Sequence, residues 1–351
     1  MSKILVNIAD KKNYNKYFTV DKLEENREII INAKTILVDH RTPQFDSDYD
    51  SDDDDDYQEQ IVICKDFFES IESLPNCTHI QCEKLGLRRL PKLPICTGVN
   101  CFFNELEELP ELPECIGLDC KNNKLRILPD LTKCQYLTCN NQYPGLEALP
   151  ELPNCKSLSC YDNKLQNLPN LPLCESLICH NNLLRKIPNL PNCRDNLICS
   201  NQTQGLEELP KILICRVLKC KNNKLKVLPE LPKCEILECQ NNKLKVLPEL
   251  PSCQPHLDYH YVECENNPDL YYPRSVARKF RLTYPSPGNK RHYKEIFNRI
   301  LNKKRANNAF NALLEKIRMK PSISLDEERR FRDAIANLNL REEQEQELKS
   351  Y

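Results

Sequence analysis

The sequence predicts an α+β repeat solenoid, in which short parallel β-strands stack into one sheet and the convex side runs extended, close to polyproline II. Three observations predict this class. A unit of about nineteen residues recurs about ten times between residues 71 and 273. Each unit carries two cysteines with a leucine between them, followed by Leu-Pro-x-Leu-Pro. The 351 residues include 25 Pro and 21 Cys but only six Gly and no Trp, a bias typical of repetition.

Residues 1–70 precede the repeats, and we expect them to form a small N-terminal cap domain. Four short apolar runs favour a strand-rich or mixed fold that shields the open edge of the first repeat, and they lie at residues 4–6, 29–31, 36–38 and 61–63. Residues 46–56 contain eight aspartates, which cannot bury enough apolar surface to fold. The sequence therefore predicts a disordered acidic loop over residues 44–58.

The repeats themselves, residues 71–273, are expected to supply the sheet. Within each unit the segment Cys-x-x-Leu-x-Cys predicts a strand whose Cys and Leu side chains point inward. One such strand cannot bury its own apolar face, but stacking at ~4.8 Å per strand creates a continuous interior. The inward leucines should form one ladder between two cysteine ladders, and they are Leu118, Leu137, Leu158, Leu177, Leu197, Leu218 and Leu237.

The rest of each unit should contain no helix. Each proline in Leu-Pro-x-Leu-Pro lacks an amide donor and disfavours the helical region for the residue before it, so this segment should run extended. An asparagine three residues after the second cysteine is placed where the chain turns, and its amide can satisfy backbone groups of the turn and the next repeat. These asparagines are Asn123, Asn163, Asn182, Asn223, Asn242 and Asn267.

These residues resemble the leucine-rich repeat family in its short Leu-Pro-x-Leu-Pro form. The Cys-for-Leu habit and the Asn- and Lys-rich composition are most similar to leucine-rich repeat proteins of giant DNA viruses of amoebae, and more distantly to leucine-rich repeat effectors of bacteria. The resemblance implies a horseshoe whose concave sheet face binds another protein. It also implies that this chain is a viral protein and that its partner is a host protein in the host cell cytoplasm. Some bacterial effectors add a ubiquitin-ligase domain with a catalytic cysteine after the repeats, but no cysteine follows Cys264 here.

The concave sheet face is the candidate binding site. If the Cys and Leu side chains of each strand point inward, the intervening positions face outward, and several of these positions hold aromatic or aliphatic residues. A contiguous exposed patch of this kind is typical of a protein-binding site. We expect the partner to contact Phe102, Tyr136, Tyr161, Ile178, His180, Ile198, Val217 and Ile236.

Residues 274–351 are expected to form a basic C-terminal helical region, because apolar residues recur there at helical spacing. Residues 271–320 carry 14 basic side chains and two acidic ones. Two alternatives to simple protein binding follow from the ends of the chain. The basic tract over residues 274–305 could bind nucleic acid. The order strand, acidic loop and short helix in residues 1–70 is similar to the front half of the small adaptor of cullin ubiquitin ligases, which would make the chain a substrate-recognition adaptor for host ubiquitin ligation.

The cysteines are interpreted as small buried hydrophobes whose thiols stay free in a reducing compartment, and whether any of them is redox active is left open. A local group of Cys253, His256, His260 and Cys264 is the one candidate zinc site, although the repeat pattern already places both cysteines in the core. Otherwise we expect no metal, no cofactor and no catalytic residue. The six glycines never adopt the spacing of a nucleotide-binding loop, and no apolar stretch reaches the 18 residues of a membrane span. The oligomeric state is left open.

Overall fold

The computed structural model describes residues 3–9, 16–41, 55–253, 262–268 and 270. The chain divides into two units, Met1–Leu282 and Thr283–Tyr351, and all of the described residues belong to the first. The expected C-terminal helical region over 274–351, the basic tract over 274–305 and most of the expected acidic loop therefore lie outside the described residues.

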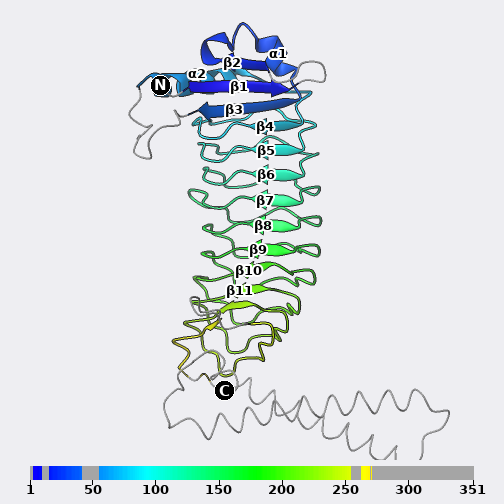
Figure 1. The fold of residues 1–351 in the computed structure, drawn as a ribbon, viewed down its shortest axis with the longest axis vertical. Helices are drawn as coiled ribbons and strands as arrows, with labels where there is room; N and C mark the ends of the chain where they lie inside the picture. The colour runs from blue at the N-terminus through cyan, green and yellow to red at the C-terminus, as the bar shows by residue number, and fades with distance from the viewer. Residues whose placement is uncertain (1–2, 10–15, 42–54, 254–261, 269, 271–351) are drawn as a thin grey trace, which may run out of the picture. The chain divides into compact units, whose positions relative to one another are not determined.

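One sheet of thirteen strands runs through the described residues, in the order β13-β12-β11-β10-β9-β8-β7-β6-β5-β4-β3-β1-β2. From β3 to β13 every neighbouring pair is parallel, and the strands stack as successive rungs (Figure 1). The repeat strands are β4 (His79–Gln81), β5 (Gly98–Asn100), β6 (Gly117–Asp119), β7 (Tyr136–Thr138), β8 (Ser157–Ser159), β9 (Ser176–Ile178), β10 (Asn196–Ile198), β11 (Val217–Lys219), β12 (Ile236–Glu238) and β13 (Val262–Glu263). This confirms the predicted fold class, a parallel solenoid of the leucine-rich repeat type.

The N-terminal segment extends the sheet. It consists of β1 (Lys3–Ala9), β2 (Lys16–Thr19), the short 3-10 helix η1 (Val20–Lys22), α1 (Arg27–Ile31), β3 (Thr35–Arg41) and α2 (Asp55–Ser70). Strand β3 pairs in parallel with β4, and β1 lies antiparallel between β3 and β2. The first repeat therefore has no open edge, because its strand is already hydrogen-bonded to the cap.

One boundary differs from the expectation. The acidic loop predicted over residues 44–58 ends earlier, since α2 begins at Asp55 and residues 55–58 are helical. Acidic side chains are favourable in the first turn of a helix, where they face the positive end of its dipole. Residues 44–54 lie outside the described residues.

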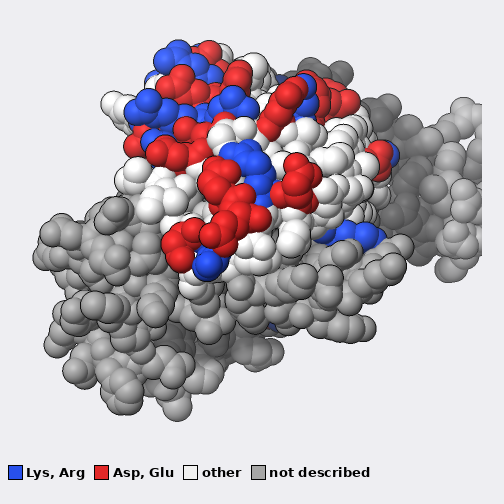
Figure 2. All heavy atoms as spheres, turned by 90° about the horizontal axis from the view of Figure 1, so that it is seen from above, with Lys and Arg blue, Asp and Glu red and all other residues white. Residues whose placement is uncertain are grey.

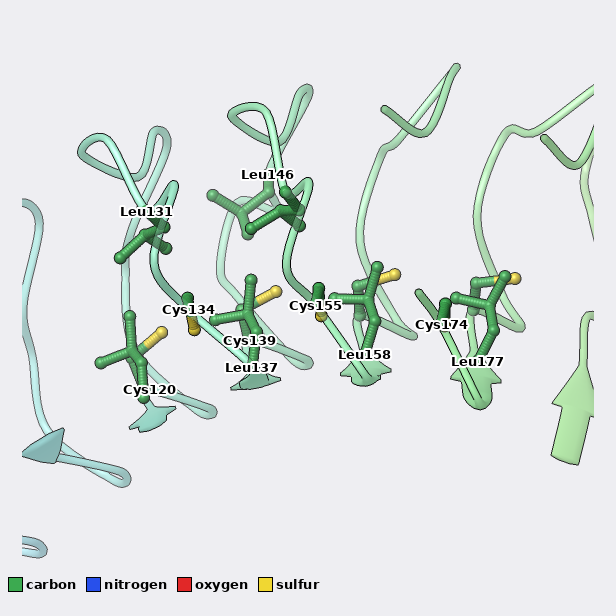
Figure 3. Packing of buried hydrophobic residues seen from close by; sticks show 14 of the residues in the cluster. Cys120, Leu131, Cys134, Leu137, Cys139, Leu146, Cys155, Leu158, Cys174 and Leu177 are labelled. Atoms are coloured by element: carbon green, nitrogen blue, oxygen red, sulfur yellow. The ribbon is translucent and has the colours of Figure 1, made fainter. Parts of the chain in front are cut away.

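The interior of the solenoid consists of leucine and cysteine side chains from successive coils. Figure 3 shows Cys120, Leu137, Cys139 and Leu158 of neighbouring coils directed toward one interior, and all four are at most 2% exposed. All 21 cysteines are buried thiols. Two cysteine columns flank the leucine ladder, as predicted, and they belong to the same buried cluster.

The strands are shorter than the sequence pattern suggested. Each described repeat strand has two or three residues centred on the inward leucine or its equivalent, whereas Cys-x-x-Leu-x-Cys predicted six. The first cysteine lies on a turn, where for example the Cys115 amide donates to the Leu112 carbonyl at 3.1 Å. A cysteine and a leucine three residues apart cannot both face inward on a straight strand of period two, so the chain bends between them.

The asparagines at the opposite end of the strand have the role that their spacing predicts. Asn182, 1% exposed, accepts from the Leu165 amide at 3.0 Å and donates to the carbonyls of Cys160 and Cys179 at 3.0 and 3.1 Å. The residue before it, Asn181, has φ +54°, and every described repeat has such a left-handed residue there. Between residues 71 and 253, all of which are described, the chain contains no helix, so the Leu-Pro segments are non-helical as expected.

Candidate functional site

The candidate site is the outward side of the repeat strands, which we call the sheet face. In the three-residue strands the middle residue is buried and its two neighbours are more exposed, so each strand presents two side chains outward. The residue after the second cysteine lies on the same side, because its side chain contacts those of the strand. Lys121 forms an ion pair with Asp119 at 2.8 Å, and the Ser159 hydroxyl donates to Asn140 Oδ1 at 3.2 Å.

The sheet face therefore has three columns of side chains running across the rungs. The first column consists of His79, Gly98, Gly117, Tyr136, Ser157, Ser176, Asn196, Val217 and Ile236. The second consists of Gln81, Asn100, Asp119, Thr138, Ser159, Ile178, Ile198, Lys219, Glu238 and Glu263. The third consists of Glu83, Phe102, Lys121, Asn140, Tyr161, His180, Ser200, Lys221, Gln240 and Glu265.

All eight predicted contact residues belong to these columns, but they do not form a single apolar strip. Ile178 and Ile198 are register partners in the second column. Val217 and Ile236 are register partners in the first. Tyr136 is 54% exposed, and its register neighbours Gly117 and Ser157 are small. The sheet face thus brings the four aliphatic residues of the prediction together as two pairs.

Tyr161 and His180 form the aromatic pair of the third column. Their rings stack at 4.4 Å between centroids with an interplanar angle of 13°. Burial lowers the pKa of His180 from 6.5, and nearby Lys221 lowers it as well, against the opposing effects of Asp162 and Asn181. The imidazole is therefore neutral at pH 7, and the stack is an uncharged aromatic surface.

Phe102 lies apart from the other predicted residues, on the rung of β5. Its ring packs edge-on against Phe103 at 5.6 Å between centroids, and the Lys121 ammonium lies 4.4 Å from the Phe102 ring centroid. This cation–π contact keeps part of the ring covered. Phe102 is thus less available to a partner than Tyr136.

Charged side chains of the sheet face are mostly paired within it. Glu238, whose side chain is 17% exposed, contacts Lys219 at 2.6 Å and Lys221 at 3.8 Å. Sequence reasoning named only the aromatic and aliphatic members of the columns and missed the two lysines at 121 and 221, as well as Asn140 and Ser200, which are buried. Their position directly after the second cysteine was the signal that could have identified them.

The cysteines contribute no reactive group to the sheet face. Burial raises the pKa of Cys264 to about 12 and holds the pKa of Cys120 and Cys139 well above the ordinary value of 9.0. In the first cysteine column the Cys193 and Cys215 sulfurs are 3.9 Å apart, a contact between thiols. Buried, protonated thiols of this kind are unreactive.

The candidate zinc site is only half within the described residues. Cys253 and Cys264 are buried in the interior, whereas His256 and His260 lie outside the described residues. Among the residues that the structure does describe, no group of three or more His, Cys, Asp and Glu side chains is arranged to hold a metal ion. Cys253 instead donates from its thiol to the Cys234 carbonyl at 3.1 Å.

Two further observations concern the surface as a whole. Seen from the end that carries the cap, acidic and basic side chains of the described residues lie interspersed (Figure 2). Within the described ranges, the structure has no helix with the length and apolar character that a membrane span requires.

Several solved protein chains are similar to this chain, and one of them is described below. No protein-family model matches the chain. None of the curated proteins matches it either. The solved structure is YopM, a leucine-rich effector protein from Yersinia pestis, which is 31% identical with a TM-score of 0.48. The match covers 61% of this chain and 60% of the effector chain.

Proposed function

We propose that the chain is a non-enzymatic binding protein whose sheet face docks another protein. The observation that carries this proposal is the fixed array of outward side chains on ten parallel rungs. Hydrogen bonds between neighbouring strands and the buried Leu and Cys ladders hold each rung, so little conformational entropy is left to lose on binding. The eight contact residues proposed from the sequence all belong to this array.

The chemistry of the sheet face supports recognition better than catalysis. Interfaces are rich in tyrosine and poor in charge at their centre, and Tyr136 together with the Tyr161–His180 stack offers such a surface. Two kinds of catalytic group are unavailable there, because the thiols are buried and Asp119 and Glu238 are paired with lysines.

We also propose that the partner is a host protein and that the chain acts as a viral protein in the host cell cytoplasm. Support for this part comes from the sequence alone, namely the Cys-for-Leu repeats and the Asn- and Lys-rich, Gly-poor composition that resemble leucine-rich repeat proteins of amoebal giant viruses.

Affinity capture from host lysate tests the proposal. The bait is the full chain as wild type, as Tyr136→Asp/Tyr161→Asp/Ile178→Asp and as Val217→Asp/Ile236→Asp. The matched control is Ile127→Asp/Val227→Asp, which changes two apolar residues that are 72% and 69% exposed outside the sheet face. We expect the control to retain the wild-type partners and at least one sheet-face variant to lose them. Identical partner lists for all four folded baits would overturn the proposal.

A further inference from the structure

Four neighbouring rungs of the sheet face carry no charged residue in any of the three columns. We call the residues of β7 to β10 in these columns the neutral belt. Ten of them have partly exposed side chains, namely Tyr136, Thr138, Ser157, Ser159, Tyr161, Ser176, Ile178, His180, Asn196 and Ile198, and the two others, Asn140 and Ser200, are buried at 1% and 3% exposure. The rungs on either side are charged. The β6 rung carries Asp119 and Lys121, and the β11 rung carries Lys219 and Lys221.

The flanking charges are already neutralised within the protein. Lys121 pairs with Asp119 at 2.8 Å, and Glu238 pairs with both lysines of the β11 rung. Beside the three columns, Asp162 accepts a hydrogen bond from the Asn181 amide, and Glu175 pairs with Arg194. A charged group of a partner that settled on the neutral belt would lose its water without gaining an unpaired counter-charge from the columns of the belt or of its two flanking rungs, which is costly.

The first and last rungs of the neutral belt are also the two repeats with longer turns. Six residues lie between Cys139 and Leu146 and between Cys199 and Leu206, whereas four lie between Cys160 and Leu165. Both long turns are tied to the coil before them, because the Tyr143 amide donates to the Asn123 carbonyl and the Thr203 amide donates to the Asn182 carbonyl, each at 2.9 Å.

The first of these turns is exposed at its tip, where Tyr143 is 81% exposed. Exposed loops on a rigid scaffold commonly supply binding contacts. The two turns therefore border the same four rungs that carry no charge. At the start of the turns, burial of Asn140 and Ser200 accounts for their uncharged side chains.

The dimensions of the neutral belt favour a short segment over a large surface. Four rungs at ~4.8 Å and three columns at ~6.6 Å make an area of roughly 380 Å². A standard protein interface buries about 800 Å² on each partner. A stretch of about five or six extended residues, at ~3.4 Å each, covers the belt. The partly exposed side chains of Thr138, Ser157, Ser159, Ser176 and Asn196 can bond its backbone. Tyr136, Ile178 and Ile198 can contact its side chains.

We infer that the neutral belt is the docking site for a short, uncharged segment of the partner protein that carries aliphatic or aromatic side chains and lies beside the two long turns. The inference rests on the proposed function and narrows it to four rungs and one class of ligand.

The test uses a phage-displayed library of random peptides, selected on the immobilised full chain. Enriched peptides are then measured against three variants. Thr138→Asp and Ile178→Asp introduce a charge within the belt. Asn100→Asp is the matched control, because Asn100 and Thr138 are the two register partners of Asp119, so each substitution places a second carboxylate beside it.

We expect the enriched peptides to be uncharged and rich in aliphatic or aromatic residues. The Kd of these peptides should rise at least tenfold for the two belt variants. For Asn100→Asp it should stay within about twofold of the wild-type value. Circular dichroism should be unchanged for all three variants. Enrichment of charged peptides, equal weakening by the control, or no enrichment at all would overturn the inference. If lysate capture still depends on Val217 and Ile236 in that case, the proposed function stands and only the belt fails.

Discussion

Two adjacent residues form the turn that follows each repeat strand, and they have different roles in it. The first has a left-handed backbone, with φ between 53° and 57° in every described repeat, and it is Asn in seven of the ten. Asparagine tolerates this conformation better than most residues, which explains its prevalence. The first two repeats have Lys84 and Phe103 there instead, and nothing in the structure explains that choice.

The side chains of these first asparagines also bond one another along the stack. Asn201 donates to Asn181 Oδ1 at 2.9 Å, and Asn266 donates to Asn241 Oδ1 at 2.8 Å. Such a ladder needs the same residue type in consecutive coils. The repetition of Asn in the sequence thus has a side-chain as well as a backbone reason.

The second asparagine of the pair supplies the first prediction. Asn182→Ala leaves the Leu165 amide and two carbonyls without their partner inside a buried turn. Since each buried unsatisfied group costs about 1–3 kcal/mol and three groups lose their partner, we expect the free energy of unfolding to fall by at least about 3 kcal/mol. Urea denaturation followed by circular dichroism measures it.

The control for this substitution is Asn192→Ala, an exposed asparagine that makes one hydrogen bond, to the Pro172 carbonyl. It should change the free energy of unfolding by less than about 1 kcal/mol. Equal losses for both variants would contradict the assignment of the Asn182 hydrogen bonds as a main support of the turn.

At the scale of one strand, the outward positions follow different packing rules from the inward ones. The inward position is Leu in seven of the ten repeat strands and Ile or Val in the others, whereas the first outward column includes two glycines, Gly98 and Gly117, in neighbouring strands. The His79 ring lies over Gly98, and a Cβ atom there would come within 2.7 Å of His79 Cδ2. A Cβ on Gly117 would meet nothing within 4 Å.

The two glycines give a matched pair for the second prediction. Gly98→Ala must displace the imidazole and its contacts, so we expect it to lower the free energy of unfolding by about 1 kcal/mol. Gly117→Ala should leave it unchanged or raise it by up to about 1 kcal/mol, because alanine restricts the unfolded chain. Parallel urea titrations measure the difference. Similar values for the two variants would mean that His79 does not lie over Gly98.

At the scale of the whole molecule, the stacked coils place ten thiols in the second cysteine column, from Cys82 to Cys264. Burial raises the pKa of every one of them above 9.0. A thiol with a raised pKa in the folded state contributes stability that is complete below its unfolded pKa. That stability is lost as the pH rises from 9.0 toward the folded pKa, which for Cys264 is about 12.

The third prediction is a cooperative alkaline unfolding. Each thiol that stays protonated only in the folded state lowers the free energy of unfolding by about 1.4 kcal/mol per pH unit above 9.0. The ten thiols of the second cysteine column together lower it by about 14 kcal/mol per pH unit. Because domains are stable by about 5–15 kcal/mol, we expect unfolding near pH 10. Circular dichroism and thiolate absorbance, recorded together with a reductant present, should change in one step. Thiolates that form gradually while the circular dichroism stays constant would contradict the prediction.

Much of this architecture could be predicted from the sequence, because a repeating unit must make the same contacts in every coil. The buried Leu118 and Cys120, the non-helical Leu-Pro segments and the bonding role of Asn182 all follow from spacing and from the chemistry of single residues. The strand length was overestimated, since the bend after Cys115 depends on which way the preceding turn directs the chain. The start of α2 at Asp55 was missed because composition alone does not locate a helix end.

The sequence by itself determined the repeat, its inward and outward positions and the absence of a nucleotide-binding loop, because these depend only on residue type and period. Only the tertiary structure decided how outward residues of different coils meet. The stacking of Tyr161 on His180, the pairing of Glu238 with two lysines and the coincidence of four uncharged rungs with two long turns depend on register between strands distant in sequence. Register is fixed by the packing of the whole solenoid, and a local pattern cannot specify it.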